Sequence, residues 1–167
     1  DEARALANYV RAADRATCVY ANEEAARFYT EALHLLPEVD MQRFDVLKAR
    51  AQVYNVMARP DAQAQDVKAM LALCEHLHDE ARLFDALLAE ADYKLQINLR
   101  EVRQPATRAL QIAQRLGDPQ REGHALACLS FDSRVTDLEQ GRQELEMAVA
   151  RFRQAGRLDK VAQCLHN

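Results

Sequence analysis

Apolar residues recur at every third or fourth position along most of the sequence, which is the spacing of one buried face of an α-helix. Breaks between these periodic segments fall at regular intervals. Together they predict helices over residues 3–20, 22–36, 40–58, 63–77, 79–98, 102–116, 118–133, 136–155 and 157–166. No segment has the pattern of a strand. Alanine is abundant and glycine and proline are scarce, so composition also favours an all-α fold.

Most of these predicted helices begin at a residue that can cap the free backbone amides of the first turn. The predicted capping residues are Asn22, Asp40, Asp79, Asp118 and Thr136. Pro119 follows Asp118, at the one helical position where a missing amide hydrogen costs nothing. Thr136 and Glu139 have the spacing of a capping box. Short connections between the helices then force neighbours to pack as antiparallel hairpins.

The hairpins look like copies of one unit. Residues 44–51 match residues 84–91 at Phe, Asp, Leu, Ala and Ala after a shift of 40 positions. The second helices share a small residue at Ala32, Ala72, Ala113 and Ala148, whose separations are 40, 41 and 35. Internal repetition at this period is typical of stacked helical repeats.

One stretch resembles a known family. Residues 6–37 resemble a tetratricopeptide repeat, with Ala13, Ala25, Tyr29, Ala32 and Pro37 at the family's small, aromatic and proline positions. Later units run near 40 residues where the family has 34. The ending at residues 115–119 resembles longer repeats found C-terminal to nucleotide-binding modules in large bacterial signalling ATPases and transcriptional regulators. The chain departs from the family in having no tryptophan and in carrying Ala13 and Ala51 at the first-helix glycine position.

This resemblance implies a right-handed α-α superhelix, a solenoid of antiparallel hairpins. The expected units are 3–37, 40–78, 79–117 and 118–156, followed by a trailing helix at 157–166. Small residues would let paired helices approach closely, while large ones fill the space between hairpins. The expected large residues are Leu6, Tyr9, Phe28, Phe44, Leu47, Phe84, Leu87 and Phe152. The first residues contain no methionine or signal pattern, so we expect an excerpt of a larger protein.

Charge and cysteine content narrow the possible functions. The net charge of -4 and the pI near 5.8 argue against a nucleic-acid partner, and no apolar run is long enough to cross a membrane. Four widely separated cysteines are typical of neither a disulfide scaffold nor a paired metal site. We therefore expect reduced thiols and a cytoplasmic location.

Candidate chemistry is sparse. Cys74 and His78 share a helix face, but His76 points elsewhere, and two ligands do not make a zinc site. The candidate nucleophiles are Cys18, Cys128, Ser130 and Ser133, and the candidate bases are His34, His124 and His166. None lies in a recognisable catalytic motif, and no glycine-rich phosphate loop is present. We expect no enzyme activity, no metal and no cofactor.

The tyrosines and phenylalanines Tyr20, Phe28, Tyr29, Tyr54 and Tyr93 could line an aromatic ligand pocket, although helical spacing favours a place in the core. The resemblance implies instead that ligands bind on a concave face lined by the first helix of each pair. The expected residues are Asp45, Lys48, Gln52 and Asn55 in the second unit, Asp85, Leu88 and Asp92 in the third, and His124 with Arg134 in the fourth. The acidic members suggest a partner with basic residues. Lys48 and Asn55 resemble part of the family's clamp for C-terminal carboxylates, but the clamp is incomplete.

The sequence thus predicts a protein-protein interaction module, part of a cytoplasmic bacterial regulator, that binds a peptide, a protein or another domain of its parent. Two alternatives remain open. The chain could be a sensor domain for a small-molecule effector, or a spacer that self-associates as a homo-oligomer. A deep apolar pocket would favour the sensor, and a concentration-dependent mass would favour the spacer.

Overall fold

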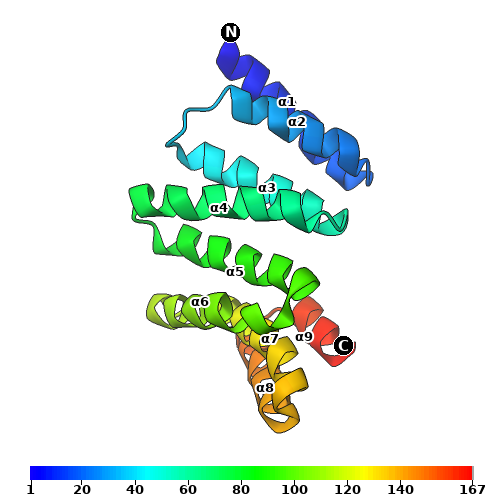
Figure 1. Cartoon of the computed structure of the whole chain (residues 1–167), viewed down its shortest axis with the longest axis vertical. Helices are drawn as coiled ribbons and strands as arrows, with labels where there is room; N and C mark the ends of the chain where they lie inside the picture. The colour runs from blue at the N-terminus through cyan, green and yellow to red at the C-terminus, as the bar shows by residue number, and fades with distance from the viewer. Residues whose placement is uncertain (167) are drawn as a thin grey trace. The chain divides into compact units, whose positions relative to one another are not determined.

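A computed structural model describes residues 1–166 as helices joined by short connections, with no strand in that range (Figure 1). The elements are α1 (Glu2–Cys18), α2 (Asn22–His34), α3 (Met41–Val56), α4 (Pro60–Leu77), α5 (Glu80–Ile97), the 3₁₀ turn η1 (Leu99–Glu101), α6 (Arg103–Leu116), α7 (Pro119–Thr136), α8 (Leu138–Gln154) and α9 (Leu158–His166). The prediction of an all-α fold is confirmed. No helix within residues 1–166 is long and apolar enough to cross a membrane. The chain forms two compact units whose boundary falls inside α5, between Arg82 and Leu83.

The first unit, Asp1–Arg82, contains two hairpins: α1 packs on α2, and α3 packs on α4, while α2 also contacts α3. Its helices approach through small residues that are fully or almost fully buried. These residues are Ala13, Ala25, Ala32 and Ala51. Tyr29, at the aromatic position of the resemblance, is buried as well, and its hydroxyl donates to Asp14 Oδ1 at 2.7 Å. Phe44 and Leu47 of α3 lie in the same core.

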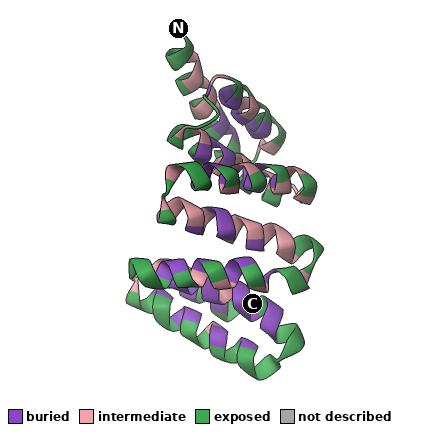
Figure 2. Cartoon of the chain, turned by 60° about the vertical axis from the view of Figure 1, so that its left-hand side comes forward, coloured by how far each residue is buried: buried purple, intermediate pink, exposed green. Residues whose placement is uncertain are grey.

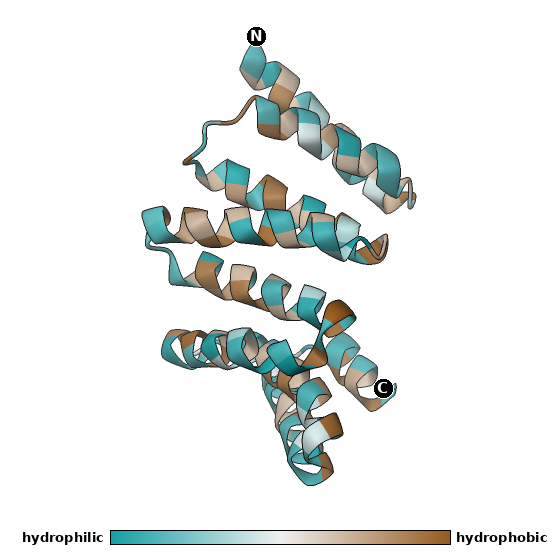
Figure 3. Ribbon diagram, in the orientation of Figure 1, coloured by the Kyte–Doolittle hydropathy of each residue, from teal (hydrophilic) through white to brown (hydrophobic). Residues whose placement is uncertain are grey.

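The second unit begins at Leu83 and contains most of α5 together with η1 and α6–α9. Within it α7 packs on both α6 and α8, η1 contacts α6 and α7, and α9 contacts α8. One buried cluster joins α7, α8 and α9 through Leu126, Ala148, Val149, Phe152, Val161 and Cys164. A second cluster contains Ala91, Val102, Ala106, Cys128 and Leu129. Figure 2 shows buried residues running in stripes along these helices, and Figure 3 shows hydrophilic and hydrophobic residues interleaved on them.

Three of the predicted caps are confirmed. Asp40 accepts from the amide of Gln42 at 2.6 Å, and Asp79 and Asp118 each accept from the amide three residues later at 3.0 Å. Two are wrong. Asn22 is already the first helical residue of α2 and makes no cap, and α7 continues through Thr136, so that Asp137 caps α8 instead. At α8 the carboxylate of Asp137 takes the capping role that Thr136 was predicted to have, whereas α2 begins after Ala21 without a capping side chain.

Several packing predictions need correction. Ala72 is exposed, although its proposed equivalents Ala113 and Ala148 are fully buried. Tyr20 is 83% exposed and therefore belongs neither to the core nor to a pocket. Leu6 and Tyr9 are only half-buried. The repeat boundaries and the expected excerpt remain predictions.

Tyr20 has a left-handed backbone, with φ of 59°, and Ala58 follows the same pattern with φ of 51°. Each lies just after a first helix, α1 or α3, and the chain there reverses into the second helix of the hairpin. A left-handed residue at this position satisfies the last free carbonyls, and glycine normally provides it. This left-handed turn explains why α1 and α3 end at Cys18 and Val56, two residues before their predicted ends.

Candidate functional site

The first group of predicted binding residues lies on one side of α3. Asp45, Lys48, Gln52 and Asn55 follow at steps of three or four residues, so they share one face of the helix. Asp45, Gln52 and Asn55 are exposed, and Lys48 is half-buried. We call these four residues the α3 face. Their partner-binding role stays a prediction.

Asp45 is an exposed charged residue of the α3 face, and its carboxylate lies near Arg82. Its carboxylate lies 3.6 Å from Arg82, which also pairs with Asp79 at 2.6 Å and lies over the ring of Phe44. The Asp45 side chain is 62% exposed, and a pair so well solvated contributes little stability. Asp45 is therefore free to exchange its neighbour for a ligand at small cost.

A buried ion pair holds α3 from beneath. Arg50 donates through Nε to Asp66 Oδ2 at 2.9 Å and through Nη2 to Asp66 Oδ1, and its Nη1 donates to Thr30 Oγ1 at 2.7 Å. These contacts tie α3 to both α2 and α4. The sequence pattern did not predict this pair. A usable signal was present, because Gln63 and Asp66 occupy the apolar stripe of α4 beside Val67 and Met70.

The second group lies on α5 and α7. Asp85, Leu88 and Asp92 follow at helical steps on α5, and all three are half-buried, as is His124 on α7. We call these four residues the α5–α7 face. Leu88 packs on the cluster that contains Cys128, so part of this face also serves the core.

Asp92 is the most unusual group of the α5–α7 face. Its Oδ1 accepts a hydrogen bond from the thiol of Cys128 at 3.7 Å, and the positive charge of Lys160 acts on it. Burial raises the pKa of Asp92 from 3.8 to about 6, and the weak thiol hydrogen bond and the charge of Lys160 only partly oppose that rise. Burial likewise raises the pKa of the Cys128 thiol, which stays protonated and unreactive.

His124 lies one helical turn before Cys128. Its ring meets the ring of Phe152 edge-on, with the centroids 5.0 Å apart. Burial lowers the pKa of His124 below 6.5, and the nearby positive charges of Lys160 and Arg157 lower it further. His124 is thus held in its neutral form near physiological pH. Arg134, considered for the same face, is exposed and lies over the ring of Phe131.

A polar network joins α6, α7 and α8, and the sequence analysis missed it. Arg103 donates through Nε to Asp132 Oδ2 and through Nη2 to Ser133 Oγ, both at 2.6 Å. Ser133 in turn donates to Glu144 Oε2 at 2.6 Å. Asp132, Ser133 and Glu144 are buried, whereas Phe131 beside them is exposed. Polar residues occupy buried positions here and an aromatic residue occupies an exposed one, and this reversed pattern could have indicated the network from the sequence. The network also occupies Ser133, one of the candidate nucleophiles.

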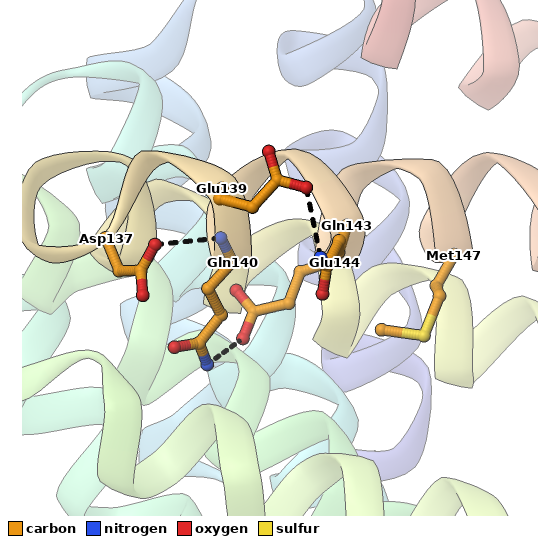
Figure 4. A pocket seen from close by; sticks show the side chains of 6 residues that line it. All are labelled: Asp137, Glu139, Gln140, Gln143, Glu144 and Met147. Atoms are coloured by element: carbon orange, nitrogen blue, oxygen red, sulfur yellow. Dashed lines mark hydrogen bonds between the residues drawn. The ribbon is translucent and has the colours of Figure 1, made fainter.

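Next to this network, α8 borders an open hollow of about 460 Å³ (Figure 4). Its lining residues are Asp137, Glu139, Gln140, Gln143, Glu144 and Met147. Most of these polar groups already bond to one another, as Gln140 does through Nε2 to Glu144 Oε1 at 2.9 Å. A second hollow of about 550 Å³ is lined by Arg100, Arg103, Asp132, Thr136, Asp137 and Gln140. Apart from Met147, every residue that lines these two hollows is polar or charged, whereas typical small-molecule pockets are lined mainly by apolar and aromatic residues.

Among residues 1–166, no group of three or more His, Cys, Asp or Glu side chains is placed to hold a metal ion. All four cysteines are free, with Cys18 exposed and the other three buried. Three of the four thus behave as small core residues.

The helices pack in antiparallel pairs through small buried residues, so the chain is an all-α protein built of helical hairpins. The chain is similar in structure to a signal transduction ATPase with numerous domains from Pyrococcus horikoshii that has a tetratricopeptide repeat sensor. The TM-score is 0.74 at 18% sequence identity over 95% of this chain, so the likeness supports the fold. The chain spans 26% of the length of that protein. No protein-family model matches the sequence, and no curated protein does.

Proposed function

We propose that the chain is a regulatory protein-interaction module that binds a protein or peptide segment on the polar faces of its first helices. The observation that carries this proposal is the α3 face, where Asp45, Gln52 and Asn55 stand exposed on a helix held in place by the buried pair of Arg50 and Asp66. A rigid helix that presents a row of polar groups is suited to recognition at low entropic cost. The structural neighbour, a signal transduction ATPase with a tetratricopeptide repeat sensor, supports a regulatory role of the same class.

The state of the candidate nucleophiles supports a non-catalytic role. The thiol of Cys128 is buried and bonded to Asp92, and the hydroxyl of Ser130 donates to the carbonyl of Ala127 at 2.7 Å. Ser133 is bound within the Arg103 network. None of the three is paired with a histidine that could activate it.

The experiment that tests the proposal is affinity capture from a native lysate with three charge-reversal variants. Asp45→Arg alters the α3 face and Asp85→Arg alters the α5–α7 face. Glu75→Arg is the matched control, because Glu75 is an exposed acidic residue on α4, a second helix. Substitutions at the exposed Asp45 and Glu75 should cost little stability. Asp85 is half-buried, so circular dichroism would verify that each variant is folded before its binding is compared.

We expect a protein that is retained by the wild type and by Glu75→Arg, and that is lost from Asp45→Arg, from Asp85→Arg or from both. Retention that is equal in all variants would exclude these faces as the binding surface. If the chain retains no protein and its own mass in light scattering rises with concentration, the result would instead support a spacer that self-associates.

A further inference from the structure

The short helix α9 is held in place by few contacts. Its buried side chains are Val161 and Cys164, which pack on the cluster of α7 and α8, while Leu158 and Leu165 are 71% and 70% exposed. A helix of nine residues is not stable by itself in water. Its helical state therefore depends on this docking, and segments of this kind open well before the rest of a protein.

His124 is positioned beside the surface on which α9 docks. The ring of Phe152, which belongs to the cluster that receives Val161 and Cys164, lies against Gly123 and His124 of α7. A β-carbon at Gly123 would come within 2.8 Å of that ring, so the fit between α7 and Phe152 is tight. A change of charge at His124 therefore acts next to Phe152, which belongs to the cluster that holds α9.

The charged groups around His124 come from several elements. The positive charges of Lys160 on α9 and of Arg157 just before it act on His124, and the carboxylates of Asp159 and of the cap Asp118 partly offset them. From α5, Asp92 acts on Lys160, and from α8, Arg151 is paired with Glu122 at 2.8 Å. The two cations therefore face a neutral imidazole at neutral pH, with the Asp92 carboxylate as a counter-charge for Lys160.

We propose that α9 is a latch released by protons: protonation of His124 sets a positive charge against Lys160 and Arg157 and detaches α9 from α7 and α8. Release exposes the apolar surface of Leu126 and Phe152, which α9 covers in the docked state. This inference does not depend on the binding role proposed for the α3 face.

The direction of the pH dependence follows from the docked state. The docked form lowers the pKa of His124 below its ordinary 6.5, so the released form binds the proton more tightly. The docked form is therefore fully stable above about pH 6.5 and is lost as pH falls through the window between 6.5 and the lowered value.

Hydrogen–deuterium exchange on the full chain tests this latch, with mass spectrometry at about pH 7.5 and about pH 5.5 and with rates corrected for the intrinsic pH dependence of exchange. The peptide covering 157–166 should open several-fold more at the lower pH, while peptides from α7 and α8 stay protected. His124→Gln should remove this pH response, and Lys160→Gln should weaken it. The matched control is His34→Gln, because His34 is an exposed histidine on α2 and its loss should leave the response intact.

Protected peptides of α7 and α8 in the same samples show that each variant is folded. The proposal is overturned if wild-type 157–166 opens equally at both pH values, or if His124→Gln keeps the full response. A pH response that spreads equally over α7 and α8 would also overturn it, because that result describes global unfolding.

Discussion

The half-buried carboxylate of Asp92 should destabilise the chain at neutral pH, and Asp92→Asn should relieve that cost. Burial raises the pKa of Asp92 from 3.8 to about 6. Each pKa unit corresponds to about 1.4 kcal/mol, so the ionised form costs up to about 3 kcal/mol relative to a solvated aspartate. Asparagine has the same shape and keeps a carbonyl oxygen that can accept from the Cys128 thiol.

The sign of the effect is fixed by the raised pKa. Below pH 3.8, Asp92 is neutral in the folded and unfolded states, so the variant and the wild type should be equally stable. Between pH 3.8 and about 6 the unfolded carboxyl ionises first, and wild-type stability is lost as pH rises. Above that window the advantage of Asp92→Asn should reach its full value of up to about 3 kcal/mol.

Urea unfolding followed by circular dichroism at about pH 4, 5, 6 and 7 measures this advantage. Asp45→Asn is the control, because Asp45 is well exposed and its variant should change stability by less than about 1 kcal/mol at each pH. A gain for Asp92→Asn that is the same at every pH would refute the reasoning. So would a loss near pH 7, since it would mean that the carboxylate is solvated or paired.

Three further predictions concern stability, and the same urea measurements at neutral pH test them. Ala58→Gly should stabilise the chain by about 0.5–1 kcal/mol, because Ala58 has a φ of 51° that glycine adopts without strain; no gain would mean that the turn is not left-handed. Gly123→Ala should cost about 1–3 kcal/mol, because its β-carbon would lie 2.8 Å from the ring of Phe152; the matched exposed change Gln65→Ala should be nearly neutral. Arg50→Ala should cost about 3–5 kcal/mol by leaving Asp66 buried without its partner, and a cost below about 1 kcal/mol would contradict the ion pair.

Helix positions could be predicted from the sequence because caps and apolar periods are local signals. Asp40, Asp79 and Asp118 lie where their helices begin, and the amides they satisfy are two or three residues away. The errors at Asn22 and Thr136 are shifts of one residue: α2 begins after Ala21, which has no capping side chain, and α8 is capped by Asp137. Local chemistry fixes a helix to within a turn, and tertiary packing then selects the cap.

Buried polar partners could not be predicted in the same way, because their partners are distant in sequence. Arg50 and Asp66 are 16 residues apart, and Arg103 and Asp132 are 29 apart. A sequence shows that Asp66 interrupts an apolar stripe, but it does not show which arginine the fold brings to it. For the same reason the exposed position of Ala72 could not be foreseen from its spacing to Ala32.

Asp66, Asp132 and Asp92 differ in how far their charges are compensated within the chain. Asp66 and Asp132 each accept hydrogen bonds from an arginine, so their charges are compensated within the chain. Asp92, on the predicted binding face, has only the thiol of Cys128. A buried carboxylate with a raised pKa is a typical feature of a functional site. If a partner binds the α5–α7 face, we expect one of its basic groups to add to the attraction between Lys160 and the Asp92 carboxylate.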